Sequence, residues 1–194
     1  MPRLSIAQLK QDIVFSVTLR DRLFSFHTTW GLFSPEKIDD GSYLLIKHVE
    51  VKPNDRIVDL GCGYGAIGLA LAPETSQQVT LIDKDFVAIE YTKKNAELNK
   101  IMNCETLLSN GFTQIPADRS FTLIVSNLPA KVSKEMYWIL FNDAYQKLEK
   151  GGRLYVVVIA GLKEFIKRNF NEIFGNYDKV AHTNTHLVAM ATKV

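Results

Sequence analysis

Asn127, Leu128 and Pro129 are the residues whose types and spacing most directly suggest chemistry. They close an apolar run, FTLIVSN (121–127), so that an asparagine ends a predicted strand shortly before a proline. One interpretation is an ordinary turn, in which both residue types are common. The other is the rim of a pocket that holds an amino group, with Asn127, Leu128 and Pro129 as candidate catalytic residues. The rest of the chain is needed to choose between them.

A glycine-rich loop, VDLGCGYGAIG (58–68), follows another apolar run and opens a helical pattern. Glycines at such a position permit a tight turn and let backbone amides approach a ligand at the helix N-terminus. The spacings G-x-G-x-x-A (61–66) and G-x-G-x-x-G (63–68) both occur. Asp83 ends the next predicted strand, 22 positions after Gly61, where a carboxylate suits a ribose diol. The loop therefore predicts a cofactor that carries a nucleoside.

Asp59 narrows the choice of cofactor, because it places a carboxylate two positions before the first glycine. A carboxylate is unfavourable beside a pyrophosphate and favourable beside an amino group or a sulfonium. S-adenosylmethionine carries both of these cations and no phosphate. The nicotinamide alternative expects a Tyr-x-x-x-Lys after the loop, whereas Tyr43–Lys47 precedes it. We therefore expect S-adenosylmethionine.

The elements that position these residues alternate along the chain after about residue 55. Near-continuous apolar runs predict strands at 57–61, 79–83, 106–110, 121–127 and 153–160. Helical patterns lie between them at 66–72, 86–99, 132–150 and 161–174, the third ending at Gly151-Gly152. Residues 177–194 predict two strands joined at TNT. This alternation predicts an α/β fold, a doubly wound Rossmann-like sheet with right-handed crossovers.

The first 50 residues differ from the rest. The segment 13–27 alternates apolar and polar residues about RDR, which predicts a hairpin, and 41–51 predicts a short helix. The loop between them, 28–41, contains Trp30 and Phe33, which either serve a ligand or pack on each other within a lid. We expect an N-terminal extension, 1–50, packed on a cofactor-binding domain, 51–194.

The composition sets limits on function and location. The 194 residues carry a net charge of +2 and are 46% hydrophobic, which fits a globular domain without a strong charge bias toward nucleic acid. We find neither an apolar run of membrane-spanning length nor a signal-peptide core, and expect a cytoplasmic protein, monomeric or homodimeric. The two cysteines, Cys62 and Cys104, predict no disulfide framework. His182 and His186 flank the TNT turn without an evident third ligand, so no metal is expected.

The chain resembles the class I S-adenosylmethionine methyltransferases, and specifically the methyltransferase small domain family, from about residue 24 to its C-terminus. The resemblance rests on GLFSPEKIDDGSYLL, VDLGCGYGAIGLALA, the strand ending at Asp83, LLSNGF, SNLPAKVSKE and the terminal hairpin. It implies a seven-stranded sheet with an antiparallel last strand, the glycines under the methionine part of the cofactor, Asp83 on the ribose and Asn110 near the adenine. We assign as cofactor-binding residues Asp59, Gly61, Cys62, Gly63, Gly65, Asp83, Lys84, Asn110, Gly111 and Asn127.

The family usually ends its fourth strand in N-P-P followed by an aromatic residue, a pattern shared by methyltransferases of exocyclic amines and of glutamine amide. Such a nitrogen is a poor nucleophile, because its lone pair is delocalised. The asparagine oxygen and one backbone carbonyl accept its two hydrogens and turn the lone pair toward the methyl group. Here Leu128 replaces the first proline, which adds flexibility, and Ala130 replaces the ring.

The missing ring leaves the substrate side open to several assignments. Stacking on an aromatic side chain is worth about 1–3 kcal/mol per base, so a base substrate needs another ring. Phe33 and Trp30 are our candidates. Lys131 and Lys134 are candidate phosphate contacts, together with Lys163, Lys167 and Arg168, although Lys163 and Lys167 also fit a solvated helix face.

The predicted function is methyl transfer from S-adenosylmethionine to an exocyclic amine of a base in RNA, similar to the ribosomal RNA guanine amine methyltransferases of this family. One alternative is a small-molecule methyltransferase, suggested by Ala130 and the modest net charge. A second alternative is a protein that binds the cofactor without catalysis.

Overall fold

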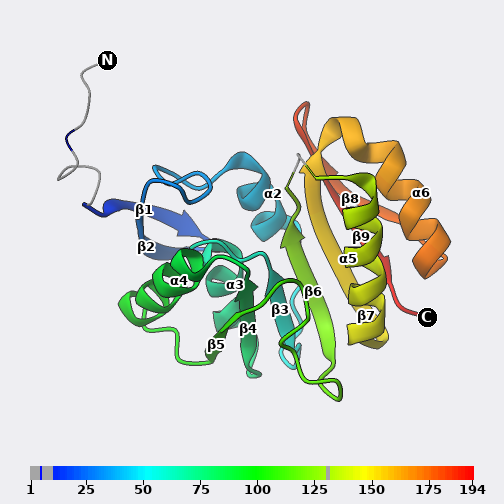
Figure 1. Cartoon of the computed structure of the whole chain (residues 1–194), viewed down its shortest axis with the longest axis horizontal. Coiled ribbons are helices and arrows are strands. Elements are labelled where there is room, and N and C mark those ends of the chain that lie inside the picture. Colours follow the sequence, from blue (N-terminus) through cyan, green and yellow to red (C-terminus); the bar gives the residue numbers. More distant parts are fainter. Residues whose placement is uncertain (1–4, 6–10, 130–131) are drawn as a thin grey trace.

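The computed structural model describes residues 5, 11–129 and 132–194. The larger sheet within these residues consists of β3 (Ile57–Leu60), β4 (Val79–Asp83), β5 (Cys104–Leu108), β6 (Phe121–Asn127), β7 (Leu148–Ile159), β8 (Asp178–His182) and β9 (His186–Thr192). The strand order is β5-β4-β3-β6-β7-β9-β8 (Figure 1). Strands β3 to β7 run parallel, and β9 runs antiparallel to both of its neighbours. The predicted mostly parallel sheet with an antiparallel last strand is confirmed.

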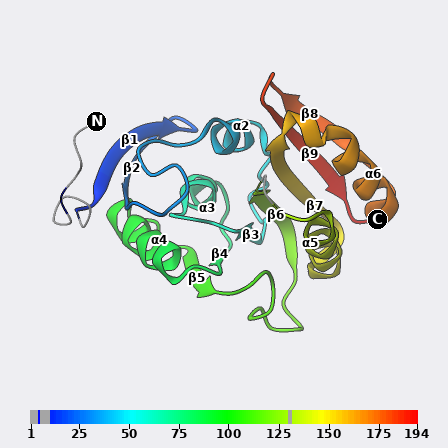
Figure 2. The same ribbon diagram turned by 45° about the horizontal axis from the view of Figure 1, so that its top comes forward.

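Helices cover both faces of the sheet (Figure 2). One face carries α2 (Asp40–His48), α3 (Ala66–Leu71) with the short turn η1 (Ala72–Glu74), and α4 (Phe86–Leu98). The other carries α5 (Lys134–Lys147) and α6 (Lys163–Phe174), which follows the turn η2 (Ala160–Leu162). A hydrophobic cluster lies on each side of the strands. This two-sided burial explains why the strand sequences are apolar without alternation.

The predicted end of the third helix at Gly151-Gly152 is wrong. Helix α5 ends at Lys147, and β7 begins at once with Leu148, which is 2% exposed and pairs with Phe121 of β6. The glycine pair lies inside β7, where the N–H of Gly151 donates to the carbonyl of Lys193 at 2.7 Å. Burial of Leu148 and strand pairing therefore override the local helix-stop signal of the glycines.

The N-terminal hairpin is confirmed as a separate two-stranded sheet of β1 (Ile13–Leu19) and β2 (Arg22–Thr28). Its turn residues Arg20 and Asp21 both have positive φ, 47° and 62°, as a two-residue type I′ hairpin turn requires. The Arg20 guanidinium forms an ion pair with Glu74 and donates to the carbonyls of Ile46 (2.8 Å) and Val49 (2.9 Å). These contacts attach the turn to the C-terminal end of α2.

Asn95 of α4 and Asn99, the C-cap of that helix, take the place of a third strand along β2. The side-chain oxygen of Asn95 accepts from the N–H of His27 at 2.8 Å, and its Nδ2 donates back to the His27 carbonyl at 2.9 Å. Asn99, one helical turn later, makes the same pair of bonds with Ser25, at 2.9 and 2.8 Å. These amides satisfy the backbone of an edge strand that would otherwise need solvent or another strand.

Asp12 attaches the start of the hairpin to α4. Its carboxylate accepts from the Tyr91 hydroxyl at 2.7 Å and contacts His27 Nδ1 at 2.8 Å and the Lys94 ammonium. Burial acts to raise the pKa of Asp12, but the hydrogen bonds from Lys94, His27 and Tyr91 outweigh it and hold the pKa well below its ordinary value. The hairpin is thus attached to the helices at its start, along β2 and at its turn.

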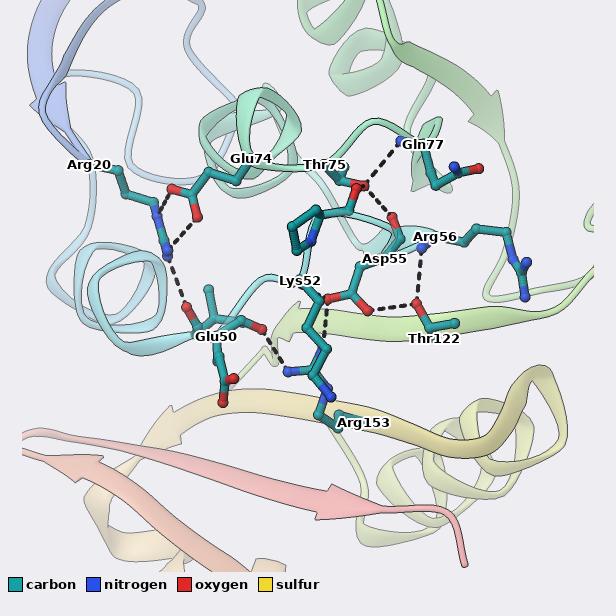
Figure 3. A network of polar contacts seen from close by, with 12 residues as sticks. Arg20, Glu50, Lys52, Asp55, Arg56, Glu74, Thr75, Gln77, Thr122 and Arg153 are labelled. Atoms are coloured by element: carbon teal, nitrogen blue, oxygen red, sulfur yellow. Dashed lines mark hydrogen bonds and ion pairs between the residues drawn. The ribbon is translucent and has the colours of Figure 1, made fainter.

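A buried ion pair joins β7 to the segment that precedes β3 (Figure 3). Arg153 and Asp55 are 6% and 3% exposed, and Nη2 of Arg153 lies 2.5 Å from Oδ2 of Asp55. Asp55 also accepts from the N–H of Lys52 (2.7 Å) and the hydroxyl of Thr122 (2.8 Å), while Arg153 donates to the Glu50 carbonyl (2.8 Å). With these additional bonds, the pair orders the amino ends of three strands.

Candidate active site

Neighbouring parallel strands end together at one edge of the sheet, and the predicted site residues follow those ends. The N–H of Gly61, just after β3, donates to the carbonyl of Ile82 in β4 at 2.9 Å. The hydroxyl of Ser126 in β6 donates to the carbonyl of Leu60 at 2.7 Å. These bonds fix the loops that leave β3 and β6 relative to one another. Ligands bind at this edge in doubly wound sheets.

The glycine loop presents an open outer face. Gly61, Gly63 and Gly65 have φ values of 76°, 57° and 92°, and no atom lies within 4 Å of the place where a side chain would begin at Gly61 or Gly63. On the inner side, the hydroxyl of Thr92 in α4 donates to the Gly63 carbonyl at 2.8 Å. Cys62 is buried, and burial raises the pKa of its thiol. The loop is therefore held from α4 and open toward a ligand.

Asp59 lies beneath this loop and is completely buried. Its Oδ2 accepts from the N–H of Gly68 at 2.8 Å, while Oδ1 is buried without a hydrogen-bond donor among the described residues. Burial raises the pKa of Asp59 to about 7, with the N–H of Gly68 opposing the rise and the charge of Asp83 adding to it. Asp59 does not line the open face. An unsatisfied carboxylate oxygen below the loop nevertheless suits a cationic ligand.

Gly68 permits the close approach of α3 to the sheet. A side chain there would begin 2.6 Å from Cδ2 of Leu81 and 3.0 Å from Cβ of Asp59. The helix that begins at the glycine loop, α3, therefore packs directly on β3 and β4, and its Gly68 lies against Leu81 and Asp59.

Asp83, at the end of β4, points its carboxylate at the glycine loop. Oδ2 accepts from the N–H of Gly63 at 2.9 Å, and Oδ1 accepts from the N–H of Asp85 at 2.9 Å. Each carboxylate oxygen has a second lone pair, and Asp83 is partly exposed. The fixed carboxylate can therefore accept two further hydrogen bonds, as a ribose diol would provide.

Asn110, Gly111 and Lys84 lie at the same edge of the sheet, in the turns that follow β5 and β4. Asn110 is exposed and Gly111 has a φ of 59°, so the two form a turn after β5. The N–H of Ser109 donates to the carbonyl of Asp83 at 2.8 Å, which brings this turn beside the end of β4. Lys84 is exposed. These three residues therefore lie beside Asp83 at the same edge of the sheet.

Asn127 is fixed by α2, a contact that the sequence did not reveal. Its Nδ2 lies 3.2 Å from both carboxylate oxygens of Asp39 and 3.0 Å from Oγ of Ser42. Asp39 is the N-cap of α2 and accepts from the N–H groups of Gly41 (2.9 Å) and Ser42 (3.2 Å). No described residue donates to Oδ1 of Asn127. Oδ1 is therefore available to a ligand.

Leu128 extends the strand pairing of β6 by one residue. Its N–H, which a proline would lack, donates to the carbonyl of Val157 at 3.0 Å, and its side chain is 5% exposed. The replacement of the first proline by leucine therefore adds a backbone hydrogen bond to β7. Within the described ranges the Leu128 carbonyl receives no hydrogen bond. The carbonyl of Pro129 accepts from the Tyr137 hydroxyl at 2.6 Å.

The structure describes three of the four candidate substrate residues, namely Phe33, Trp30 and Lys134. Phe33 and Trp30 are 68% and 43% exposed, and neither packs on another ring in the part of the chain that the structure describes. Leu32 between them is 8% exposed and anchors the loop. Lys134 is the first residue of α5, with its ammonium 6.0 Å from the centre of the Phe165 ring. Lys131, like Ala130, lies outside the described residues.

The supporting residues that the sequence did not indicate are polar groups behind the site, all buried except the partly exposed Asp39: Asp39, Ser42, Thr92, Asn95 and Tyr137. Asn95 is fully buried and its Nδ2 donates to the carbonyl of Tyr64 in the glycine loop at 2.9 Å. An aspartate before a helical pattern is a typical N-cap and could have drawn attention to Asp39. The other contacts connect segments far apart in the chain and leave no local signal.

Two surface hollows lie away from this edge. One, of about 440 Å³, is lined by residues at the amino ends of the strands, including Arg56, Arg119 and Glu149. The other, of about 540 Å³, lies between the hairpin turn and α2. Neither includes a predicted site residue. Among the described residues no group of three or more His, Cys, Asp or Glu could hold a metal ion, and no helix is long and apolar enough to cross a membrane.

The sheet order, the open glycine loop and the carboxylate at the end of β4 define a Rossmann-like methyltransferase fold. The model of the methyltransferase small domain matches residues 23–190. The chain belongs to the methyltransferase small domain family, which uses S-adenosylmethionine. The residues present fit that cofactor, because the loop is open, Asp83 has free lone pairs and Asp59 lies below as an unsatisfied carboxylate.

Several known proteins are similar to this chain. "Ribosomal RNA large subunit methyltransferase G" of Klebsiella pneumoniae is 34% identical over 88% of this chain and 47% of its own length. "Uncharacterized protein YbxB" of Bacillus subtilis is 31% identical over 93% of this chain and 91% of its own length. The structure of the Thermus thermophilus 16S rRNA N2 guanine methyltransferase RsmC, in complex with AdoMet and guanosine, has a TM-score of 0.86 and 26% identity, covering 93% of this chain and 50% of that one. The chain thus spans about half the length of the ribosomal RNA methyltransferases it matches.

Proposed function

We propose that this chain transfers a methyl group from S-adenosylmethionine to an exocyclic amine of a base in RNA, with a guanine of ribosomal RNA as the favoured acceptor. The observation that carries the proposal is Asn127. Its amide nitrogen is engaged by Asp39 and Ser42, and its oxygen is left without a donor among the described residues. Beside it, the Leu128 carbonyl is equally free. The two oxygens supply the two acceptors that an exocyclic amine needs.

The chemistry of the site follows from positioning. The cofactor supplies the reactive methyl group. Asn127 and Leu128 accept the two hydrogens of the amine, which directs the nitrogen lone pair toward the methyl group and favours in-line transfer. Pro129 and the Tyr137 hydroxyl on its carbonyl fix the backbone that follows. The glycine loop, with Gly61, Cys62, Gly63 and Gly65, and the residues Asp83, Lys84, Asn110 and Gly111 hold the cofactor in this proposal.

The choice of a guanine in RNA is supported by the relatives. Two of them are named for methylation of ribosomal RNA, and one was solved with guanosine. The exposed ring of Phe33, with Trp30 as second candidate, replaces the aromatic residue missing at Ala130 and stacks on the base. Lys131 and Lys134 contact phosphates. A small-molecule acceptor is the competing function, since a mononucleotide-sized substrate would need no phosphate contacts.

The test is transfer of labelled methyl from S-adenosylmethionine to ribosomal subunits and purified RNA, beside a protein-free metabolite fraction, all from cells lacking this protein. Asn127→Ala removes one of two acceptors, so transfer to RNA should fall about 100-fold while cofactor binding by calorimetry stays within about twofold. Asn171→Ala, an exposed asparagine of α6, is the matched control. Label confined to the metabolite fraction would establish the small-molecule alternative. Cofactor binding without transfer to any fraction would establish the non-catalytic one.

A further inference from the structure

The side chain of Asn127 can serve as an acceptor only in one of its two amide orientations. The oxygen and the NH₂ group of an asparagine are nearly the same size, so packing alone does not distinguish them. With the oxygen toward the substrate, Asn127 accepts a hydrogen from an amine. With the NH₂ group toward the substrate, it opposes the amine hydrogens. Some neighbouring group must therefore select the orientation.

Within the described ranges, the Asn127 amide nitrogen bonds to Asp39, the N-cap of α2, and to Ser42 in its first turn. Both carboxylate oxygens of Asp39 lie 3.2 Å from Nδ2, and Oγ of Ser42 lies 3.0 Å from it. A carboxylate accepts hydrogen bonds and donates none, so only the NH₂ group can face Asp39. One amide hydrogen is directed at Asp39 and the other at Ser42, which leaves Nδ2 without a hydrogen for the substrate.

We propose that Asp39 is a positioning residue, which fixes the amide of Asn127 so that Oδ1 faces the substrate amine. This role rests on the proposed function of Asn127 as an amine acceptor. Asp39 does not touch the substrate itself. It acts from 88 positions away in the sequence, through the end of β6.

The carboxylate of Asp39 is itself held in place. Its Oδ1 accepts from the N–H groups of Gly41 (2.9 Å) and Ser42 (3.2 Å), the N-terminal donors of α2. A side chain at Gly41 would begin 3.0 Å from this oxygen and 2.9 Å from Cδ2 of His186 in β9. The glycine therefore allows α2 to bring Asp39 into a narrow space between β9 and the end of β6.

Asp39→Asn tests the proposal with almost no change of shape. Asparagine is as good an N-cap as aspartate, so α2 should form normally. The cap requires the side-chain oxygen of residue 39 at the position of Oδ1, which places its NH₂ group at the position of Oδ2. That group would face the NH₂ of Asn127 and turn the Asn127 amide over. We expect kcat to fall about 10- to 100-fold, with the dissociation constant of S-adenosylmethionine unchanged.

A compensating variant separates this role from a general effect on folding. Asn127→Asp alone sets two carboxylates against each other and should also lose transfer. Combined with Asp39→Asn, it restores a donor facing an acceptor and leaves one oxygen of residue 127 toward the substrate. The double variant should recover to within about tenfold of the wild type. Asp40→Asn makes the same charge change on an exposed neighbour and should behave as the wild type.

Each outcome decides the proposal. Wild-type kcat in Asp39→Asn, or a double variant no more active than Asp39→Asn, would overturn it. Nuclear magnetic resonance of the ¹⁵N-labelled side-chain amides gives a readout independent of substrate. The NH₂ signals of Asn127, assigned by their loss in Asn127→Ala, should exchange slowly with water and shift in Asp39→Asn but not in Asp40→Asn. If the wild type methylates no RNA, the proposed function is wrong, but the positioning of the Asn127 amide by Asp39 is still tested by the NH₂ signals. Unchanged NH₂ signals in Asp39→Asn would reject that positioning role.

Discussion

Asp59 should make the protein less stable as the pH rises, because it is an acid buried without full compensation. It is completely buried, and burial raises its pKa from 3.8 to about 7. A folded-state pKa above the unfolded value means that the folded state holds the proton more tightly. The associated stability is fully present below the unfolded pKa and is lost as the pH rises through the folded pKa.

The size of the effect follows from the two pKa values. Between pH 5 and pH 8 the linkage relation gives a loss of about 2.5 kcal/mol in the free energy of unfolding from this group alone. Asp59→Asn removes the titration. Its oxygen can keep the bond to the N–H of Gly68, while its NH₂ group takes the place of Oδ1, which has no hydrogen-bond partner among the described residues. Below the folded-state pKa the protonated wild type carries an O–H group at the same place, so both proteins then bury an uncharged donor there.

The assay is urea unfolding of the wild type and Asp59→Asn at pH 5, 6, 7 and 8 without cofactor. Subtracting the free energy of unfolding of one protein from that of the other at each pH removes the contributions of the titrating groups that both proteins share. The variant should gain about 2.5 kcal/mol of stability relative to the wild type between pH 5 and pH 8. Parallel profiles would refute the argument, because they would mean that Asp59 ionises in the folded state as easily as in the unfolded chain. Above pH 7, where the wild-type carboxylate is ionised, the same variant should bind S-adenosylmethionine more weakly, since the charge beneath the loop is gone.

Three further predictions concern stability. Asp55→Ala leaves Arg153 buried without its partner and should lower the free energy of unfolding by about 3–5 kcal/mol, measured by chemical denaturation. Gly68→Ala forces a methyl group to 2.6 Å from Cδ2 of Leu81 and should cost about 1–3 kcal/mol, seen as a lower melting temperature. Asp12, with its lowered pKa, contributes stability above its unfolded pKa that is lost as the pH falls toward the folded value, so Asp12→Asn should cost on the order of 1 kcal/mol at pH 7 and less at pH 3. Protection of the hairpin from proteolysis at both pH values measures this last effect.

Local pattern predicted most of the core fold. Continuous apolar runs between helical segments identified the parallel strands, because strands covered on both faces have no solvent-facing positions. The glycine loop was also predictable from a short segment, since a backbone that turns tightly after a strand needs glycine locally. Asp83 was predicted from its position at the end of the next apolar run. Boundaries were less reliable. The Gly151-Gly152 signal predicted a helix end, whereas the structure uses those glycines within β7.

The sequence by itself indicated the chemistry proposed for this protein, through an asparagine at the end of a strand, a glycine loop and two carboxylates near it. These are properties of short segments, in which residue type and backbone conformation are coupled. Only the tertiary structure decided which side chains contact these residues and how they are oriented. Asp39 meets Asn127, Asn95 supports both the hairpin and the glycine loop, and Asp59 is enclosed beneath that loop. Such contacts join distant segments, and no local pattern records them, because which polar groups meet depends on how helices and strands pack in three dimensions.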